Sequence, residues 1–271
     1  MINQKICFIG GGNMARSLIG GLIASDVAAD ALYVADPNEN NRQQLQIDFG
    51  VHTSADNQPQ AAQCEVIVLA VKPQIMKDVV SDLQNIEGKL LISIAAGITS
   101  SAITQWLGTE AAIVRTMPNT PALVRSGATG MFANANVTEA QKEVAESIMR
   151  AVGLTLWVDT EDQLDAVTAL SGSGPAYLFL VMEAMEQAGI KLGLDAETAR
   201  LLTVQTAFGA SKLALEIEED PAVLRERVTS PGGTTEQAIK SLQEHHFETL
   251  FLQALTAARD RARELSEQLG K

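Results

Sequence analysis

Two glycine-rich turns, one near each end of the chain, carry residues whose types and spacing could do chemistry. The later turn is Ser230–Thr235, with the sequence Ser-Pro-Gly-Gly-Thr-Thr, and it is followed by the amphipathic run Glu236–Gln243. Pro231 ends the preceding helix, the glycines let the backbone turn, and the threonines lead into the next helix. Unpaired N–H groups at such a helix start favour a carboxylate or phosphate, although a simple capped loop would have the same pattern.

The earlier turn follows the first predicted strand and opens a helix. Its sequence, Ile-Gly-Gly-Gly-Asn-Met-Ala over residues 9–15, fits the pattern Gly-x-Gly-x-x-Ala in a strand–turn–helix setting. Gly10 makes the tight turn, Gly12 lets the backbone approach a pyrophosphate, and Ala15 lets the helix pack closely on the strand. This setting predicts dinucleotide binding, with NADPH or NADH as the cofactor.

Asp36, at the end of the second predicted strand, bears on which cofactor is used. An acid at this position ordinarily accepts hydrogen bonds from the adenosine ribose and disfavours a 2′-phosphate, which favours NADH. The alternative is that the pair Asp36-Pro37 starts the next helix as a cap. Arg42 and the asparagines at positions 38, 40 and 41 lie near enough in sequence to help bind a phosphate, so NADPH stays open.

Further segments would complete a crevice at the carboxyl ends of parallel strands, where ligands bind. Lys72 follows the apolar run Val66–Val71, although a lysine there is commonly just solvated surface. The small residues of Ser93–Gly97 leave room for a nicotinamide ring, and Arg115–Pro121 forms a rigid, polar rim. Ser171–Tyr177 is either another small-residue edge of the pocket or only a helix junction.

Strands and helices alternate up to about Asp159. The continuously apolar run Val66–Val71 predicts a strand buried on both faces, and therefore a parallel sheet covered by helices. The expected strands are Lys5–Ile9, Ala31–Ala35, Glu65–Val71, Lys89–Ala95 and Ala112–Thr116, with Ala128–Phe132 and Leu154–Val158 as weaker edge strands. The expected helices are Asn13–Ser25, Asn38–Phe49, Pro73–Ile86, Ser100–Leu107 and Glu139–Val152.

After Asp159 the sequence predicts almost only helices, with apolar faces larger than one small bundle needs. They are Gln163–Leu170, Pro175–Leu192, Ala196–Glu218, Ala222–Val228, Glu236–Gln243 and Phe247–Leu269. The fold class is therefore α/β, an N-terminal Rossmann-like doubly wound sheet followed by an all-α dimerisation domain. We expect a dinucleotide-binding domain at 1–160 and a helical substrate-binding and dimerisation domain at 161–271 that forms a homodimer or a higher homo-oligomer.

The composition narrows the possible partners and compartment. The chain has 271 residues, 46% of them apolar, and its 20 basic and 33 acidic residues give a net charge of −13. This charge argues against nucleic acid or an anionic membrane as partner. No apolar run is expected to reach the length of a membrane span, because Ala176–Met182 is cut by Glu183. Cys7 and Cys64 have no metal-ligand spacing, so we expect buried, reduced thiols, no metal site and a cytoplasmic location.

These segments together resemble the pyrroline-5-carboxylate reductase family over nearly the whole chain. The matching segments are the Gly10 loop, Ala70–Pro73, Ser93–Gly97, Met117–Pro121, Ser171–Tyr177 and Ser230–Thr235. The resemblance implies NAD(P)H-dependent reduction of 1-pyrroline-5-carboxylate to L-proline, the last step of proline biosynthesis. It also implies an intertwined dimer, whose sites would each combine the nucleotide domain of one subunit with Ser230–Thr235 of the other.

The resemblance also implies residue roles. The cofactor would be bound by Ile9, Gly10, Gly11, Gly12, Asn13, Met14, Asp36, Asn57, Ala70, Val71, Lys72, Pro73, Ala95 and Ala96, with Asn57 near the adenosine ribose. The substrate would be bound by Glu218, Ser230, Gly232, Gly233, Thr234 and Thr235, with Ser230 and the backbone of Gly232–Thr234 holding its carboxylate. Thr235 is the expected catalytic residue, with its hydroxyl beside the ring nitrogen. One departure is Asp36-Pro37, where many members have Ser, Asn or Arg to favour NADPH.

Two other functions remain open on the sequence alone. A β-hydroxyacid-type dehydrogenase would need a catalytic lysine in the helical half, and Lys191 and Lys212 are candidates without a polar, glycine-rich setting. A non-catalytic dinucleotide-binding sensor would keep the Gly10 loop but would not need Ser230–Thr235. For the reductase, the absence of a strong acid–base pair from the motifs is acceptable, because an iminium accepts hydride readily and Thr235 needs only to orient the substrate or relay a proton.

Overall fold

The computed structural model describes residues 2–270, which fall into two compact units. Unit 1 holds the described residues up to Ser173 together with those from Ala257 onward, and unit 2 holds Gly174–Thr256. The sequence analysis placed its boundary earlier, between residues 160 and 161. The structure divides the chain later because α7 (Gln163–Val167) packs against strands of unit 1, and the end of the last helix does so too.

Unit 1 is built on one eight-stranded sheet. Its strands lie in the order β3-β2-β1-β4-β5-β6-β7-β8, and all neighbours are parallel except β6 and β7. The strands are β1 (Ile6–Ile9), β2 (Leu32–Ala35), β3 (His52–Ser54), β4 (Val66–Leu69), β5 (Leu90–Ser93), β6 (Ala112–Met117), β7 (Gly127–Ala133) and β8 (Gly153–Trp157). The chain runs outward from β1 to β3 and then crosses to β4, so the topological switch point lies between β1 and β4.

The register places the ends of the central strands at one level. Ile9 of β1 pairs with Ala35 of β2 and with Leu69 of β4, and Leu69 in turn pairs with Ser93 of β5. The segments that follow these four strands therefore leave the sheet at the same edge. This edge is where a dinucleotide binds in a doubly wound fold.

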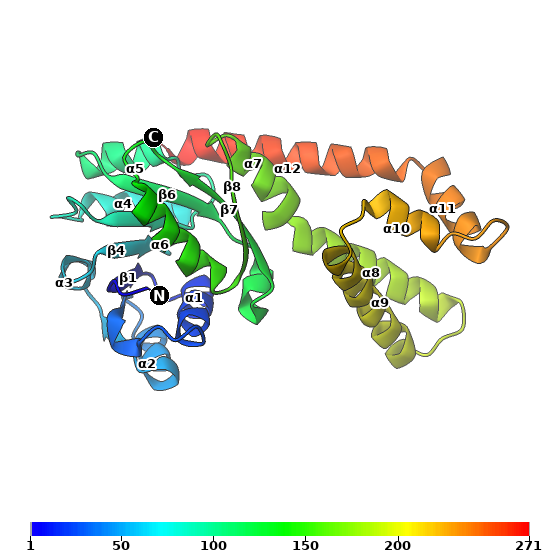
Figure 1. Cartoon of the computed structure of the whole chain (residues 1–271), viewed down its shortest axis with the longest axis horizontal. Helices are drawn as coiled ribbons and strands as arrows, with labels where there is room; N and C mark the ends of the chain where they lie inside the picture. Colours follow the sequence, from blue (N-terminus) through cyan, green and yellow to red (C-terminus); the bar gives the residue numbers. More distant parts are fainter. Residues whose placement is uncertain (1, 271) are drawn as a thin grey trace. The chain divides into compact units, whose positions relative to one another are not determined.

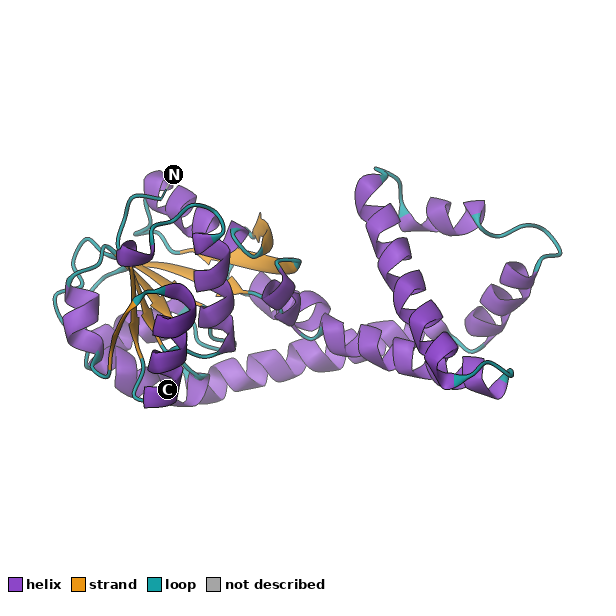
Figure 2. Ribbon diagram, turned by 90° about the horizontal axis from the view of Figure 1, so that it is seen from below, coloured by secondary structure: helices purple, strands orange, loops and turns teal. Residues whose placement is uncertain are grey.

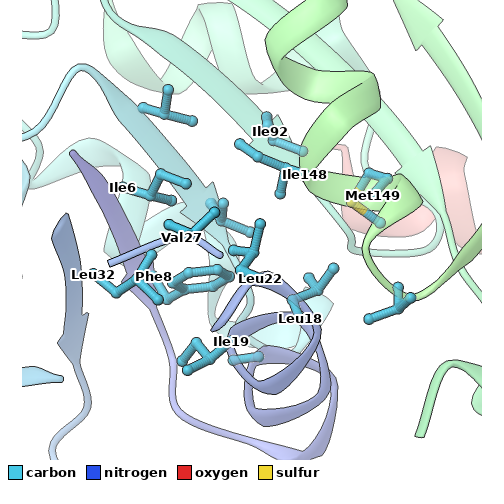
Figure 3. Close-up of a cluster of buried hydrophobic side chains, with 14 of the residues drawn as sticks. Ile6, Phe8, Leu18, Ile19, Leu22, Val27, Leu32, Ile92, Ile148 and Met149 are labelled. Atoms are coloured by element: carbon cyan, nitrogen blue, oxygen red, sulfur yellow. The ribbon is translucent and has the colours of Figure 1, made fainter. Parts of the chain in front are cut away.

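Helices cover both faces of this sheet, as Figure 1 shows. Phe8 and its same-face neighbours pack against Leu18, Ile19 and Leu22 of the first helix and Ile148 of α6, as drawn in Figure 3. The opposite face of the sheet packs on α3, α4 and α5. The helices are α1 (Asn13–Ile23), α2 (Glu39–Phe49), α3 (Asn57–Ala62), α4 (Met76–Ser81), α5 (Ser100–Leu107), α6 (Glu139–Arg150) and α7. Burial on both faces explains the continuous apolar strands.

Unit 2 consists of helices and connecting loops, without strands in its described residues (Figure 2). Its helices are α8 (Gly174–Lys191), α9 (Ala196–Glu216), α10 (Pro221–Arg227), α11 (Thr234–Glu244) and the first part of α12 (Phe247–Leu269), which ends in unit 1. Helices α8 and α9 pack on each other, with Gly189 close to Ala199. Few side chains are buried, and large apolar ones such as Phe179 and Phe208 are more than half exposed.

Most of the predicted elements are confirmed, including all six helices after Asp159 and the two weaker strands, although β7 lies inside the sheet and only β8 lies at its edge. The strand β3 and the helix α3 were missed. The predicted helix Pro73–Ile86 was too long, because the segment is a 3-10 turn, Pro73–Ile75, followed by α4. Beyond α4, Asn85 adopts a positive φ of 55°, which a regular helix does not contain.

One expectation about membranes needs correction. The helical stretch Gln163–Lys191, with 29 residues, is long and apolar enough to cross a membrane by length and composition alone. The expectation took Glu183 as the end of the apolar run and placed separate helices on either side of Ser171–Gly174. In the structure the helical stretch continues through Glu183, and a π-helical turn at Thr168–Gly172 joins α7 to α8. The same apolar surface is what a helix needs to pack against a second copy of the chain.

Candidate functional site

The loop between β1 and α1 has the geometry of a dinucleotide cradle. Gly10 has φ +100°, and a Cβ there would lie 2.6 Å from the carbonyl oxygen of Ala70, so the position requires glycine. Gly12 differs, because a Cβ built on it meets nothing within 4 Å. Its backbone therefore borders open space.

The start of α1 adds the donors that an anion needs. Gly12 is the N-cap residue and has no side chain to cap the helix, and the first backbone bond of the helix runs from Arg16 N–H to the Gly12 carbonyl. The N–H groups of Asn13, Met14 and Ala15 are therefore left without acceptors in the backbone. Together with the helix dipole they attract a phosphate.

Asp36 leaves the end of β2 but turns its side chain inward. Its Oδ2 accepts a hydrogen bond from Gly11 N–H at 2.7 Å and another from Asn41 Nδ2 at 3.2 Å. Its Oδ1 accepts from Asn38 N–H at 2.7 Å, and the residue is only 7% exposed. The N-cap of α2 is Asn38, whose side chain accepts from Asn41 N–H, so Asp36 is not the helix cap.

The other predicted cofactor residues lie at the same edge of the sheet or follow it. Lys72 is exposed after β4, and Ala95 is buried after β5 while Ala96 is half-buried. Asn57 is the first residue of α3 and is half-buried. Level strand ends and short connections thus gather the loops after β1, β2, β4 and β5 into one rim.

A partly buried ion pair fixes the segment that follows Ala95 and Ala96. Glu161 accepts hydrogen bonds from Ser100 N–H at 2.6 Å and Ser100 Oγ at 2.8 Å, and it pairs with Arg115 at 2.7 Å. Ser100 begins α5, so the carboxylate also sits favourably at a helix N-terminus. Nearby, burial raises the pKa of Asp165, an effect that Arg115 and Arg263 oppose. Glu161 therefore ties the loop after β5 to the segment before α7.

A second set of hydrogen bonds joins the segment after β6 to the start of Ser171–Tyr177. Asn119 Nδ2 donates to the carbonyl and the hydroxyl of Ser171, each at 3.2 Å, and its Oδ1 accepts from Ala128 N–H at 2.9 Å. Ser171 lies in the π-helical turn Thr168–Gly172, a feature common at functional sites. The sequence-predicted rim Arg115–Pro121 is thus fixed to Ser171.

In unit 2 the Ser230–Thr235 loop opens α11. Gly232 has φ +72°, and Gly233 is the N-cap and donates its own N–H to the Ser230 carbonyl at 2.9 Å. The first backbone bond of the helix comes from Gln237, so the N–H groups of Thr234, Thr235 and Glu236 have no backbone acceptor. They are the available donors for an anion.

One donor of this loop is already taken. Glu236 Oε2 accepts the Gly232 N–H at 2.7 Å, from the third residue of the helix back to its start. Glu218 lies between α9 and α10 and is exposed, and among the described residues no hydrogen bond joins it to the loop. The structure thus brings Ser230, Gly232, Gly233, Thr234 and Thr235 into one turn and leaves Glu218 outside it.

Three residues that shape these sites had no individual role in the sequence-based prediction: Glu161, Glu236 and Asn119, which was predicted only as part of the rim Arg115–Pro121. Glu236 had a local signal, because Glu at the third helical position after a cap commonly reaches back to the turn. Asn119 and Glu161 had none, since their partners lie 52 and 61 residues away in the sequence. Only the folded chain brings these groups together.

The two cysteines take no part in these sites. Both are free and buried, as the sequence predicted. A hydrogen bond with Cys64 and burial raise the pKa of Cys7, which keeps its thiol protonated. The same hydrogen bond lowers the pKa of Cys64, but this side chain too is buried, with 1% of the residue exposed.

Comparison with known proteins identifies the family. Residues 161–265 match the model described as pyrroline-5-carboxylate reductase dimerisation, and residues 5–97 match the one described as NADP oxidoreductase, coenzyme F420-dependent. A pyrroline-5-carboxylate reductase of Pseudomonas aeruginosa is 52% identical over 273 residues, which cover 100% of both chains. The solved structure of a pyrroline-5-carboxylate reductase from Coxiella burnetii is 51% identical, with a TM-score of 0.94 over 98% of this chain and 99% of that one.

A more distant solved structure, of Plasmodium falciparum pyrroline carboxylate reductase with NADP bound, is 30% identical. Its TM-score is 0.87 over 98% of this chain and 99% of that chain. These similarities extend over both the dinucleotide loop and the Ser230–Thr235 turn. The chain belongs to the pyrroline-5-carboxylate reductase family.

Proposed function

We propose that this chain reduces 1-pyrroline-5-carboxylate to L-proline, with NADPH or NADH as the reductant. The observation that carries the proposal is the pairing of two different anion sites in one chain. One is the open Gly12 backbone at the start of α1, and the other is the Thr234–Thr235 start of α11. A dinucleotide-binding module alone needs only the first.

The cofactor is held by the loops at the carboxyl edge of the sheet. Gly10–Met14 bind the pyrophosphate, Asn57 lies toward the adenosine ribose, and Ala70–Pro73 with Ala95 and Ala96 border the nicotinamide. The open space beside Gly12 fits this arrangement. The bound nicotinamide supplies the hydride. The residues of the chain position the nicotinamide ring for this transfer.

The substrate carboxylate is held by Ser230 and by the backbone N–H groups that open α11. Those of Thr234 and Thr235 lack backbone acceptors, and a charge-assisted hydrogen bond from each is stronger than one between neutral groups. Thr235 is the second residue of α11. Its hydroxyl orients the ring nitrogen of the substrate or relays a proton to it. Glu218 is assigned to the substrate's surroundings.

The chemistry asks little of acid–base groups. The iminium carbon takes a hydride, the C=N π bond becomes the nitrogen lone pair, and the product amine takes up a proton from solvent when required. Alignment of two rings accounts for much of the catalysis, and such proximity effects reach about 7–11 kcal/mol in ideal systems. Thr235 therefore needs only to orient the ring nitrogen or relay a proton, with no strong base required beside it.

Assembly through the C-terminal helices follows from the surface of unit 2. Residues such as Leu192, which is 87% exposed, and Leu215, which is 83% exposed, leave apolar area uncovered. A second copy covers such area in an obligate homo-oligomer. The apolar stretch Gln163–Lys191 lies entirely within the dimerisation family match, so the same partner accounts for it. The buried, reduced cysteines fit a cytoplasmic location.

A single assay separates this proposal from its rivals. Nicotinamide absorbance is followed with the cyclic imine and each reduced cofactor, and separately with β-hydroxy acids and each oxidised cofactor. The proposal predicts oxidation of reduced cofactor that depends on the imine. Reduction of oxidised cofactor by hydroxy acids instead would favour a dehydrogenase, and cofactor binding without turnover would favour a sensor.

A further inference from the structure

We propose that Asp36 is a positioning residue, which holds the glycine loop by accepting a hydrogen bond from Gly11 N–H. Arg42 provides the positive charge beside the adenosine 2′ position. The chain therefore prefers NADPH despite its acidic residue after β2. The inference rests on the proposed use of NADPH or NADH and assigns the selectivity of that site. It assigns Asp36 a role other than the ribose contact and the helix cap, which the sequence left open as alternatives.

The carboxylate of Asp36 is largely committed to the protein. Three donors already bind it: Gly11 N–H, Asn38 N–H and Asn41 Nδ2. A carboxylate has about four lone-pair positions, so at most one remains for a ribose hydroxyl. With 7% of the residue exposed, that position is poorly accessible.

The packing around Gly11 shows that Asp36 supports the loop. A Cβ at Gly11 would lie 3.2 Å from Asp36 Oδ2 and 2.9 Å from Leu45 Cδ1. The loop backbone therefore rests directly on the carboxylate and on α2. The Gly11 N–H points inward to Asp36, while Gly12 borders open space on the cofactor side. Asp36 thereby pre-organises the loop, which lowers the cost of ordering it on binding.

Arg42 lies over the same strand end with the opposite charge. Its Nη1 donates to the carbonyl of Asp36 at 2.7 Å and to the carbonyl of Pro37 at 2.9 Å. The guanidinium is half-exposed, and among the described residues it has no salt bridge. Its remaining N–H groups are free to bind a phosphate, for which the guanidinium fork is well suited.

The two charges at the end of β2 thus differ in their exposure to solvent. The negative charge is buried under the glycine loop and satisfied there, and the positive charge faces solvent at the end of β2. An arginine near the end of the second strand is what accommodates a 2′-phosphate in this fold. The acid after β2 therefore does not impose a preference for NADH.

The experiment measures cofactor binding without substrate, by fluorescence or calorimetry, on the full chain. Arg42→Gln should weaken NADPH binding about tenfold or more, in line with the loss of a charge-assisted hydrogen bond, and leave NADH binding within about twofold. Adenosine 2′,5′-bisphosphate, used as a competitor, should lose affinity in parallel, whereas adenosine 5′-monophosphate should not. Arg150→Gln, which removes an arginine of α6 paired with Glu146, is the matched control and should change neither.

Asp36→Asn tests the positioning role. The amide cannot satisfy Gly11 N–H, Asn38 N–H and Asn41 together, so both cofactors should bind about five- to tenfold more weakly, with their ratio unchanged within about twofold. If Asp36 instead contacts the ribose, the variant shifts the ratio strongly toward NADPH. A tenfold shift of that kind, or an Arg42→Gln variant with an unchanged ratio, would overturn the inference.

A milder variant keeps the test valid if Asp36→Asn does not fold. Asn41→Ala removes one donor from Asp36 but keeps its charge, and should weaken both cofactors equally by a smaller factor. A change in the NADPH to NADH ratio would again contradict the positioning role. These measurements need no turnover. A chain that binds NADPH through Arg42 but does not reduce the imine would therefore contradict the proposed function and leave the roles of Asp36 and Arg42 standing.

Discussion

The two glycine turns are similar in design but differ in how completely each is built within its own unit. In both, a carboxylate of the chain accepts a hydrogen bond from a loop N–H at 2.7 Å: Asp36 from Gly11 and Glu236 from Gly232. Asp36 is buried and has two further donors. Glu236 is half-buried beside an exposed loop.

This difference in burial shows which of the two sites is fully formed within a single chain. The Gly10 loop rests on Asp36, Leu45 and the Ala70 backbone, so its shape is set before a cofactor arrives. Around Ser230–Thr235 the chain provides donors but little covering surface. A substrate there would stay in water unless another surface closes over it, and hydrogen bonds to its carboxylate would be correspondingly weaker.

The largest expected effect concerns the hydroxyl of the exposed loop. Thr235→Val keeps the shape of the side chain and should lower kcat about 10²–10⁴-fold, as loss of a positioned proton-handling group does. Cofactor affinity should stay unchanged. Thr234→Val, which keeps the backbone N–H, is the control and should have a much smaller effect on steady-state turnover. Normal turnover by Thr235→Val would leave only the backbone of this loop in the mechanism.

Two substitutions in the glycine loop should separate an effect on folding stability from an effect on cofactor binding. Gly10→Ala puts a Cβ against the Ala70 carbonyl at a positive φ and should lower the free energy of unfolding by about 2–3 kcal/mol. Gly12→Ala meets open space and should leave stability nearly unchanged while weakening cofactor binding. Urea denaturation and cofactor titration of both variants check this. Equal losses of stability would show that Gly12 is structural as well.

Mixing two inactive variants tests whether one copy completes the site of another. Gly12→Val blocks the pyrophosphate in one chain, and Thr235→Val removes the hydroxyl in the other. If a site takes its two loops from different copies, a mixed dimer keeps one intact site and should regain up to about half of the activity, by site count under two-fold symmetry. Activity that stays at the level of the separate variants, after mass measurements confirm exchange, would place both loops of a site in one chain.

The smallest effect should come from Glu236. Glu236→Gln removes a negative charge beside the site for the substrate carboxylate and should lower KM about two- to fivefold, the scale of a solvent-exposed charge interaction. Added salt should shrink the difference. Glu244→Gln, at the far end of α11, is the control for charge removal. A KM that rises in Glu236→Gln would mean that the carboxylate helps to hold the substrate turn.

The sequence could predict what depends on local pattern. The Gly-x-Gly-x-x-Ala loop, the apolar strands and the start of α11 each follow from neighbouring residues, and the structure contains them. The strand β3, His52–Ser54, escaped because it is short, polar and partly exposed at the edge of the sheet. Its strand character comes from pairing with β2, which local pattern does not contain.

The direction in which a side chain points was the other feature that could not be predicted from the sequence. Asp36 at the end of β2 has the same sequence context whether it faces a ribose or the Gly11 N–H, and only the packing of α2 beside the loop decides between them. The ties from Asn119 to Ser171 and from Glu161 to Ser100 likewise depend on which loops the sheet brings together. Tertiary placement, which propensity does not encode, fixed these contacts.

Transfer of a label from cofactor to product tests the central claim most directly. NADPH carrying deuterium on the transferring face of nicotinamide C4 is incubated with the enzyme and the cyclic imine, and the proline formed is analysed by mass spectrometry and NMR. We predict one deuterium per proline, on the ring carbon that was the imine carbon. Proline without deuterium, or label released to solvent, would contradict direct hydride transfer from the cofactor to the imine.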